Sequence, residues 1–446
     1  MKYSASRLIR LWRSRAKYIY LLFPKWVRQL VPLIALNPPD DQNKEYSAEL
    51  PEGYGPKRAV IRLSIPRMPE GREYSFCEHI RDDKTNDTLI CTSAGGFAVS
   101  RDLGENWHSV NLWRHADVGF RNAHLLPNGE LLLLATDPDN EGTPTGSNTL
   151  FVVTDLMGNV LHSEKRSGAG WHGSRGIDSS NGTIMYAEYT PNRAQTKFNT
   201  APHRPSRVWR SRDNGRSWTK VHEETGIRHF HLLQAHPDKP GEWWLASGDD
   251  EEESRIWKST DDGETWRDQT EKFGDTVRIG DETFSRRLFR LTDLAFVGEE
   301  ILWGCDDVLR RLIVEPRGKR ENSAPASRVF RGNPSTGLPP ANMGVCGPEV
   351  RSMVELRDFY VVITQSSHHF PGNEGPKVFL LRRDGAPGRD NLCHLFDVER
   401  HTNEGTGFTF SRASRTAKDG TFFTFRNRAD VFNAPMHILK WQITFE

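Results

Sequence analysis

Arginine recurs at the start of segments that the sequence predicts to be β-strands. The five positions are Arg121 in FRNAHLL, Arg175 in HGSRGI, Arg228 in IRHFHLL, Arg290 in FRLTDL and Arg351 in EVRSMVEL. A guanidinium group binds a carboxylate or a sulfate through two parallel hydrogen bonds. If these strand starts surround one opening, the arginines predict a site for an anion, with an acidic saccharide as the natural candidate. The alternative is that each arginine pairs with a carboxylate of a neighbouring sheet and only ties the fold together.

Side chains that transfer protons lie where the following strands are predicted to end. These positions are Asp137, Glu188 with Tyr189, Asp249, Asp306 with Asp307, and His368 with His369. A glycan-cleaving enzyme would use Glu188 or Tyr189 as base or nucleophile, and Asp249 or Asp306 as acid. Adjacent residues of a strand point to opposite faces, so Glu188 and Tyr189 reach one site only if the strand ends or bulges there.

Two histidines, His229 and His231, are two residues apart and are therefore expected on one face of a strand. With Asp249 or Asp306 they could bind a divalent metal, or act as acid and base in a lyase that cleaves a uronate polysaccharide. A histidine pair beside arginines is more often a platform of hydrogen-bond donors and acceptors. We therefore expect no metal ion and no other cofactor.

A turn motif organises the chain that must position these residues. SRDLGENW begins at Ser100, SRDNGRSW at Ser211 and STDDGETW at Ser259. The aspartate can accept hydrogen bonds from amides of its own turn, the glycine allows a positive φ, and the tryptophan covers the turn. Each copy should close a β-hairpin, and none of its residues is a candidate for chemistry. The segment TDLMGN, from Thr154, indicates a decayed fourth copy.

The spacing of the motif predicts a β-propeller. The steps from position 100 to 211 and from 211 to 259 are 111 and 48 residues, and the decayed copy lies midway in the longer step. A repeat of about 50 residues suits four-stranded blades. Further strand-like segments lie at VLRRLIVEP near 308, VFLLRRDG near 378 and MHILKWQI near 436. We predict seven blades, with six as the alternative.

The last blade is expected to join the two chain ends. Its segment supplies only GFTFSRAS, GTFFTFRN and MHILKWQI, so the early strand RAVIRLSI, residues 58–65, would complete it. In such a blade the start of the first strand and the end of the second lie on one face, at the mouth of the central channel. The long segments 137–148, 190–206 and 366–376 follow second strands, and 190–206 could be a substrate lid.

Over residues 60–446 the repeats resemble the Asp-box, or BNR, repeats of the sialidase-like propeller superfamily. The run from AEYTPN through RVWRSRDNGRSW and STDDGETW to LWGCDD is similar to bacterial BNR-repeat proteins often labelled sialidase or glycosyl hydrolase. The resemblance implies a tyrosine nucleophile with a glutamate base, an aspartate acid and three arginines on the substrate carboxylate, residue types that Glu188, Tyr189, Asp249 and the arginines supply. The Arg-Ile-Pro element of the family is imperfect, because Ser64 precedes Ile65.

Composition and charge limit the partners. The 446 residues carry a net charge of +1, so the sequence does not predict nucleic-acid binding. Five scattered cysteines without a CxxC pair imply neither a zinc ribbon nor a disulfide framework and suit a reducing compartment. Residues 1–39 hold eight Lys or Arg and no acid. This segment is either an interfacial helix that contacts an anionic membrane through residues 1–36, or a packed helix or disordered leader.

The sequence thus divides into a basic N-terminal segment (1–39), a linker (40–57) and a propeller (58–446). We expect an all-β, monomeric and cytoplasmic protein, with peripheral membrane attachment and export as alternatives. Two classes of function stay open. One is a sialidase-like glycoside hydrolase, or a uronate lyase, acting on an acidic glycan. The other is a glycan-binding or scaffold propeller that uses the same channel mouth without chemistry.

Overall fold

The computed structural model describes residues 43–64, 74–80, 88–112, 115, 118–136, 148–171, 173–189, 205–305, 327–347, 349–364, 377–385, 391–397, 408–409, 420–428 and 437–446. The chain divides into two units, Met1–Lys44 and Glu45–Glu446. The predicted basic segment 1–39 lies outside the described residues, and its contact with a membrane stays a prediction. Within the described part of the chain, no helix is both long enough and apolar enough to cross a bilayer.

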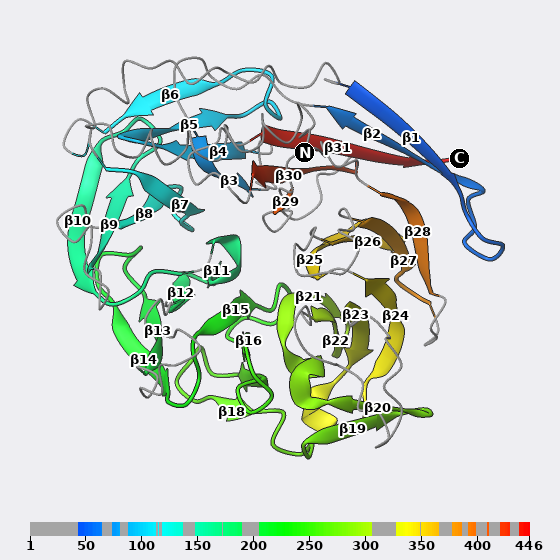
Figure 1. The fold of residues 1–446 in the computed structure, drawn as a ribbon. Helices are drawn as coiled ribbons and strands as arrows, with labels where there is room; N and C mark the ends of the chain where they lie inside the picture. Colours follow the sequence, from blue (N-terminus) through cyan, green and yellow to red (C-terminus); the bar gives the residue numbers. More distant parts are fainter. Residues whose placement is uncertain are drawn as a thin grey trace, which may run out of the picture. The chain divides into compact units, whose positions relative to one another are not determined.

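Small antiparallel sheets make up nearly all of the described chain (Figure 1). The first three have the strands β3 (Tyr74–Ile80), β4 (Thr88–Ser93), β5 (Gly96–Ser100) and β6 (His108–Asn111); β7 (Phe120–Leu125), β8 (Leu131–Thr136), β9 (Asn148–Thr154) and β10 (Val160–Ser167); and β11 (Ile177–Ser180), β12 (Thr183–Ala187), β13 (Ser206–Ser211) and β14 (Thr219–Glu224). Within each of these sheets the strands follow one another in chain order.

Three further four-stranded sheets repeat this order. They consist of β15 (Phe230–Ala235), β16 (Trp243–Ser247), β17 (Arg255–Ser259) and β18 (Arg267–Asp268); β21 (Leu291–Val297), β22 (Glu300–Cys305), β23 (Ser327–Gly332) and β24 (Ala341–Gly347); and β25 (Val350–Glu355), β26 (Phe359–Thr364), β27 (Lys377–Arg382) and β28 (Leu392–Asp397). A two-stranded hairpin, β19 (Thr276–Ile279) with β20 (Glu282–Ser285), stands between β18 and β21. Three short 3-10 helices, η3 (Gly173–Arg175), η4 (Arg286–Phe289) and η5 (Pro334–Thr336), complete these elements.

The chain ends share a five-stranded sheet, in the order β1 (Asn43–Glu49), β2 (Arg58–Ser64), β31 (His437–Phe445), β30 (Thr421–Arg428) and β29 (Phe408–Thr409). β2 pairs with β31 in antiparallel register from Ala59 opposite Phe445 to Ser64 opposite Lys440. The predicted use of the early strand to complete the last blade is therefore confirmed. Part of the predicted linker also joins this sheet as β1, whose alternate residues pack against the core.

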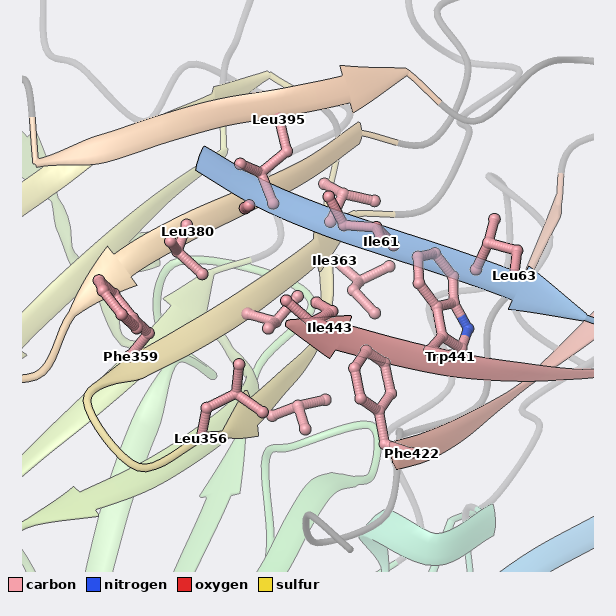
Figure 2. Close-up of a cluster of buried hydrophobic side chains, with 14 of the residues drawn as sticks. Ile61, Leu63, Leu356, Phe359, Ile363, Leu380, Leu395, Phe422, Trp441 and Ile443 are labelled. Atoms are coloured by element: carbon pink, nitrogen blue, oxygen red, sulfur yellow. The ribbon is translucent and has the colours of Figure 1, made fainter. Parts of the chain in front are cut away.

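Successive sheets contact one another through their first strands. β3 lies against β7, β11 against β15, β15 against β21, and β21 against β25. The five-stranded sheet packs on the β25 sheet through a core that includes Ile61, Ile363 and Trp441 (Figure 2). On its other side, Phe423 and Ile438 pack with Leu89 of β4. This closed succession of sheets is that of a β-propeller and confirms the predicted all-β class; the number of blades stays a prediction.

The second strands are continuous apolar runs because sheets cover both of their faces. β16 (WWLAS) and β26 (FYVVIT) are buried along their whole length. This burial holds the ends of the second strands in place, and the candidate site residues follow those ends. The strand-like segments near 378 and 436 correspond to β27 and β31. The segment near 308, the lid candidate 190–206 up to residue 204, and most of the other two long segments lie outside the described residues.

Each of the three turn motifs closes a hairpin between the third and fourth strand of a sheet, as predicted. In the second copy, Ser211 donates to the carboxylate of Asp213 (2.8 Å), which accepts from the amides of Arg216 (3.1 Å) and Ser217 (2.8 Å). Gly215 has φ +78°, and its carbonyl accepts from the indole of Trp218 (3.1 Å). The motif is therefore a self-contained turn, because its polar groups bond one another.

The decayed copy lies at the equivalent place, between β9 and β10, but it is built differently. The carboxylate of Asp155 accepts from the amides of Met157 (2.9 Å) and Asn159 (2.8 Å). Thr154 donates its hydroxyl to the carbonyl of Asn159 (3.0 Å). The aspartate thus still caps the turn, but the residue before it is Thr154, whose hydroxyl bonds backbone carbonyls and not the aspartate side chain.

Candidate ligand-binding site

The first strands share a local irregularity that sequence reasoning missed. The register with the second strand shifts by one residue near the start of β3, β7, β15, β21 and β25, as in a β-bulge. The residues at the shift include Arg121, His231 and Arg351. A bulge breaks the alternation of a strand and re-aims the side chain it carries. The bulges therefore lie where the sequence predicts the channel mouth.

Asp249 is the centre of the best-connected group of charges. It follows β16, and its Oδ2 accepts from Nη1 of Arg228 (2.9 Å) and lies 3.5 Å from Nε2 of His229. Its Oδ1 accepts from Nη2 of Arg290 (2.9 Å) and lies 3.5 Å from Nε2 of His231. Each carboxylate oxygen thus serves one arginine and one histidine. Arg228 and His229 directly precede β15 and His231 lies in it, whereas Arg290 caps η4 just before β21.

The surroundings of Asp249 hold it in the ionised form. Burial by itself would raise the pKa of this carboxyl. The hydrogen bond from His231, together with the charges of His231, His229 and Arg290, outweighs burial and lowers the pKa well below its usual range. A carboxyl group that stays ionised cannot donate a proton to a leaving group. The chemistry expected for Asp249 as a general acid therefore does not fit its environment.

Tyr189 lies beside this group. Its ring centroid is 4.1 Å from that of His229, and the side chain is partly buried. Burial raises the pKa of the Tyr189 phenol and Asp249 raises it further, whereas Arg351, Arg228 and Arg175 lower it. The phenol is thus within electrostatic reach of three of the five predicted arginines. These interactions place Tyr189 close to Arg351, Arg228 and Arg175.

Arg175 and Arg351 complete the arrangement from the β11 and β25 sheets. Nη2 of Arg175 donates to the backbone carbonyl of Arg351 (3.3 Å), although 176 residues separate the two. Arg351 forms an ion pair with Glu349 (3.0 Å), whose side chain is 6% exposed. We call Arg175, Arg228, Arg290 and Arg351 the arginine cluster. Its members come from four successive sheets and meet around Tyr189 and Asp249.

Carboxylates lie close to several members of the arginine cluster. Its four guanidinium groups lie close to three buried or partly buried carboxylates, those of Asp249, Glu349 and Glu253, the last of which accepts from the backbone amide of Arg228 (3.1 Å). Ion pairs with Asp249 and Glu349 therefore neutralise part of the cluster. Arg290 fits the predicted alternative in which arginines tie neighbouring sheets together, because it precedes β21 and bonds Asp249 after β16.

Glu188 does not face the arginine cluster. Its Oε1 accepts from the indole of Trp209 (2.9 Å) and its Oε2 accepts from the backbone amide of Arg207 (3.2 Å). Burial is the main cause that raises the pKa of the carboxyl. Glu188 and Tyr189 are adjacent but have different neighbours. The two sequence neighbours therefore act apart, because the carboxylate of Glu188 bonds Trp209 and Arg207.

The remaining predicted site residues are not part of the described cluster. Arg121 is exposed on β7 and forms no ion pair with another described residue. Asp306, Asp307, Asp137, His368 and His369 lie outside the described residues. Sequence reasoning missed Glu349 and Glu253. The sequence offered a signal for Glu349, because an acid two residues before Arg351 is expected on the same face of the strand as Arg351. It offered none for Glu253, which stands in the acidic run DDEEES, a pattern that indicates a solvated loop.

His229, His231 and Asp249 are also the described residues best placed to hold a metal ion. One ligand atom of each lies within 4.8 Å of the others, a separation that allows two imidazoles and a carboxylate to share one cation. Both oxygens of Asp249, however, already accept from guanidinium groups at 2.9 Å. A divalent cation would have to compete with these two positive charges. The arrangement therefore suits an anion better than a cation.

No protein-family model and no curated protein matches the chain. Among solved structures, the chain is similar to YCF48 bound to D1 peptide, with 13% identity over 86% of this chain and 100% of that one and a TM-score of 0.43. It is similar to the GH74 enzyme of Niastella koreensis, with 12% identity over 82% and 53% of the two chains and a TM-score of 0.47. An oligogalacturonate lyase in complex with manganese has 12% identity over 90% and 96%, with a TM-score of 0.47.

Proposed function

We propose that this chain is a seven-bladed propeller of the Asp-box, or BNR, superfamily that binds an acidic saccharide at the arginine cluster. The observation that carries the proposal is the convergence of four arginines from four successive sheets around Tyr189 and Asp249. The closed turn motifs support the superfamily, and the seven sheets of four or five strands support the number of blades.

The properties of the cluster favour an anionic sugar over a neutral one. Guanidinium groups bind planar carboxylates through paired hydrogen bonds, and water competes less at partly buried positions. The side chains of Arg351 and Arg290 are 16% and 12% exposed, whereas that of Arg228 is 38% exposed. A sugar carboxylate would bind at the exposed Arg228, close to the partly buried ring of Tyr189.

The test is a binding panel of acidic sugars and their uncharged counterparts, measured by calorimetry at fixed ionic strength. We expect glucuronate, galacturonate or N-acetylneuraminate to bind and the matched neutral sugars not to bind. Arg228→Gln should weaken binding by about ten-fold, the usual effect of one charge-assisted contact. Arg212→Gln is the control, because its side chain is 55% exposed and pairs with Asp262 and Glu264 instead. Equal binding of neutral and acidic sugars would refute the proposal.

Hydrolysis is a second candidate, favoured by the position of Tyr189 among three arginines. A sialidase-like reaction would use the phenol as nucleophile, together with a base and an acid. Turnover of sialosides and oligogalacturonides should then be lost in Tyr189→Phe while affinity is kept. Glu188→Gln separates the two candidates further. Loss of turnover in this variant would make Glu188 the base, and binding without turnover in the unmodified chain supports the binding role.

A further inference from the structure

We propose that Asp249 is a positioning residue that holds Arg228 and Arg290, here called the arginine pair, as a single two-armed receptor for an anionic group. This inference rests on the proposed function and deepens it. It gives Asp249 a role opposite to that of a proton donor. The carboxylate remains charged and acts only through the two guanidinium groups that it orients.

The bonding pattern of Asp249 carries the inference. Its two oxygens accept from the arginine pair at 2.9 Å, one arginine to each oxygen. One arginine comes from the same sheet, 21 residues before Asp249, and the other from the next sheet, 41 residues after it. A carboxylate shared in this way fixes the spacing between two side chains that no strand pairing connects. His229 and His231, each 3.5 Å from a different oxygen, restrict the carboxylate further.

The exposed fractions of Arg290, Asp249 and Arg228 show which side of the receptor faces solvent. Arg290 is 12% exposed, Asp249 18% and Arg228 38%, so Arg228 is the arm nearest to solvent. Arg228 donates to Asp249 through Nη1 and still has a side chain that is 38% exposed. A guanidinium group has five N–H donors, so Arg228 can bond Asp249 and an incoming anion together. The ligand therefore need not displace the carboxylate.

Positioning and simple electrostatics predict opposite results for Asp249→Asn. If Asp249 acted only through its charge, its removal would strengthen binding of an anion by about ten-fold, because a nearby repulsion is lost. If Asp249 orients the arginine pair, the variant should weaken binding by about ten-fold or more, because misplaced binding groups lose most of their benefit. Asp250→Asn is the matched control. It removes the same charge from the neighbouring position and leaves the bonds of Asp249 in place.

The experiment measures the affinity of the full chain for sulfate and for glucuronate by calorimetry at constant ionic strength. We expect Asp249→Asn to bind sulfate more weakly and Asp250→Asn to bind it equally or more tightly. Binding of sulfate without any acidic saccharide would refute the proposed function and leave the positioning role supported. Equal or tighter sulfate binding by Asp249→Asn, or no sulfate binding by the unmodified chain, would overturn the positioning role.

A second variant keeps the inference testable if Asp249→Asn does not fold. Arg228→Lys changes an arm that is 38% exposed and keeps its charge but not its planar fork. We expect it to bind sulfate about ten-fold more weakly, and unchanged affinity would refute the role of the arginine pair. Where both variants fold, the double variant should lose less binding free energy than the sum of the two single losses, because Asp249 and Arg228 act together. Tight binding of Zn²⁺ or Mn²⁺ that is lost in His231→Gln would also overturn the inference, since a metal would take the carboxylate from the arginines.

Discussion

Acid should destabilise this fold through one buried imidazole, that of His222 in β14. Its ring lies 5.7 Å from Trp266, 5.9 Å from Trp257 and 6.1 Å from Phe230 between centroids, and its side chain is 15% exposed. Burial lowers the pKa of His222 from 6.5 to about 4. Glu224 is 3.8 Å away, too far for a hydrogen bond to the ring.

The direction of the pH effect follows from this lowered pKa. Between pH 6.5 and pH 4 the unfolded chain binds a proton at His222 that the folded chain resists, so the stabilising contribution is complete above pH 6.5 and is lost as the pH falls. From pH 7.5 to pH 5 the loss is about 2 kcal/mol, at about 1.4 kcal/mol for each pKa unit. Because Phe230 stands between the two site histidines, acid should loosen the start of β15 as well.

The assay is the free energy of unfolding in urea at pH 7.5 and at pH 5, for the unmodified chain and for His222→Gln. Comparing the two chains removes the contribution of the carboxylates that both share. The drop in stability from pH 7.5 to pH 5 should be about 2 kcal/mol smaller in the variant. His108→Gln, at an exposed position of β6, should leave the drop unchanged. An equal drop in His222→Gln and in the unmodified chain would refute the assignment.

Three further changes test the fold and the neighbourhood of the site. Asp213→Ala removes an acceptor of the turn motif and should lower the free energy of unfolding by about 1–2 kcal/mol. The control Asp238→Ala should change the free energy of unfolding little. Equal effects of the two variants would contradict the closed turn. Glu188→Gln should raise the free energy of unfolding above pH 4.5, because the buried carboxyl resists ionisation there. In urea unfolding this gain should vanish at lower pH. A lower free energy of unfolding at neutral pH would show that the carboxylate is favoured. Trp441→Ala should lower the free energy of unfolding by about 3–5 kcal/mol, because the side chain is fully buried where the chain ends join. A loss below 1 kcal/mol in thermal unfolding would contradict that packing.

The architecture was largely predictable because its signals are local. The turn motif needs only eight consecutive residues, and its hydrogen bonds form within those residues, as at Asp213. The apolar runs of the second strands and the missing strand of the last blade are also visible in short segments. The strand at 43–49 went unnoticed, although the alternation of Tyr46, Ala48 and Leu50 carries the pattern of a half-buried strand.

The site was predictable only as a set of residue types. Strand-start arginines indicated an anion, and four of the five lie together in the cluster. Their partners were not predictable. Asp249 was expected to donate a proton, but two arginines and two histidines hold it ionised. Glu188 was a candidate base that could reach the site of Tyr189 only if the strand ended or bulged there, and its carboxylate bonds Trp209 instead.

The sequence by itself determined the turns, the strands and the class of fold, because backbone conformation and apolar periodicity depend on neighbours along the chain. Only the tertiary structure decided which charges meet. Arg290 reaches Asp249 across 41 residues and Arg175 reaches Arg351 across 176, and both contacts depend on how whole sheets pack. The register shifts near the starts of the first strands, which re-aim the side chains there, were also not visible in any local sequence pattern. The sign and strength of each charge interaction follow from these distances and from burial, and therefore from the folded structure.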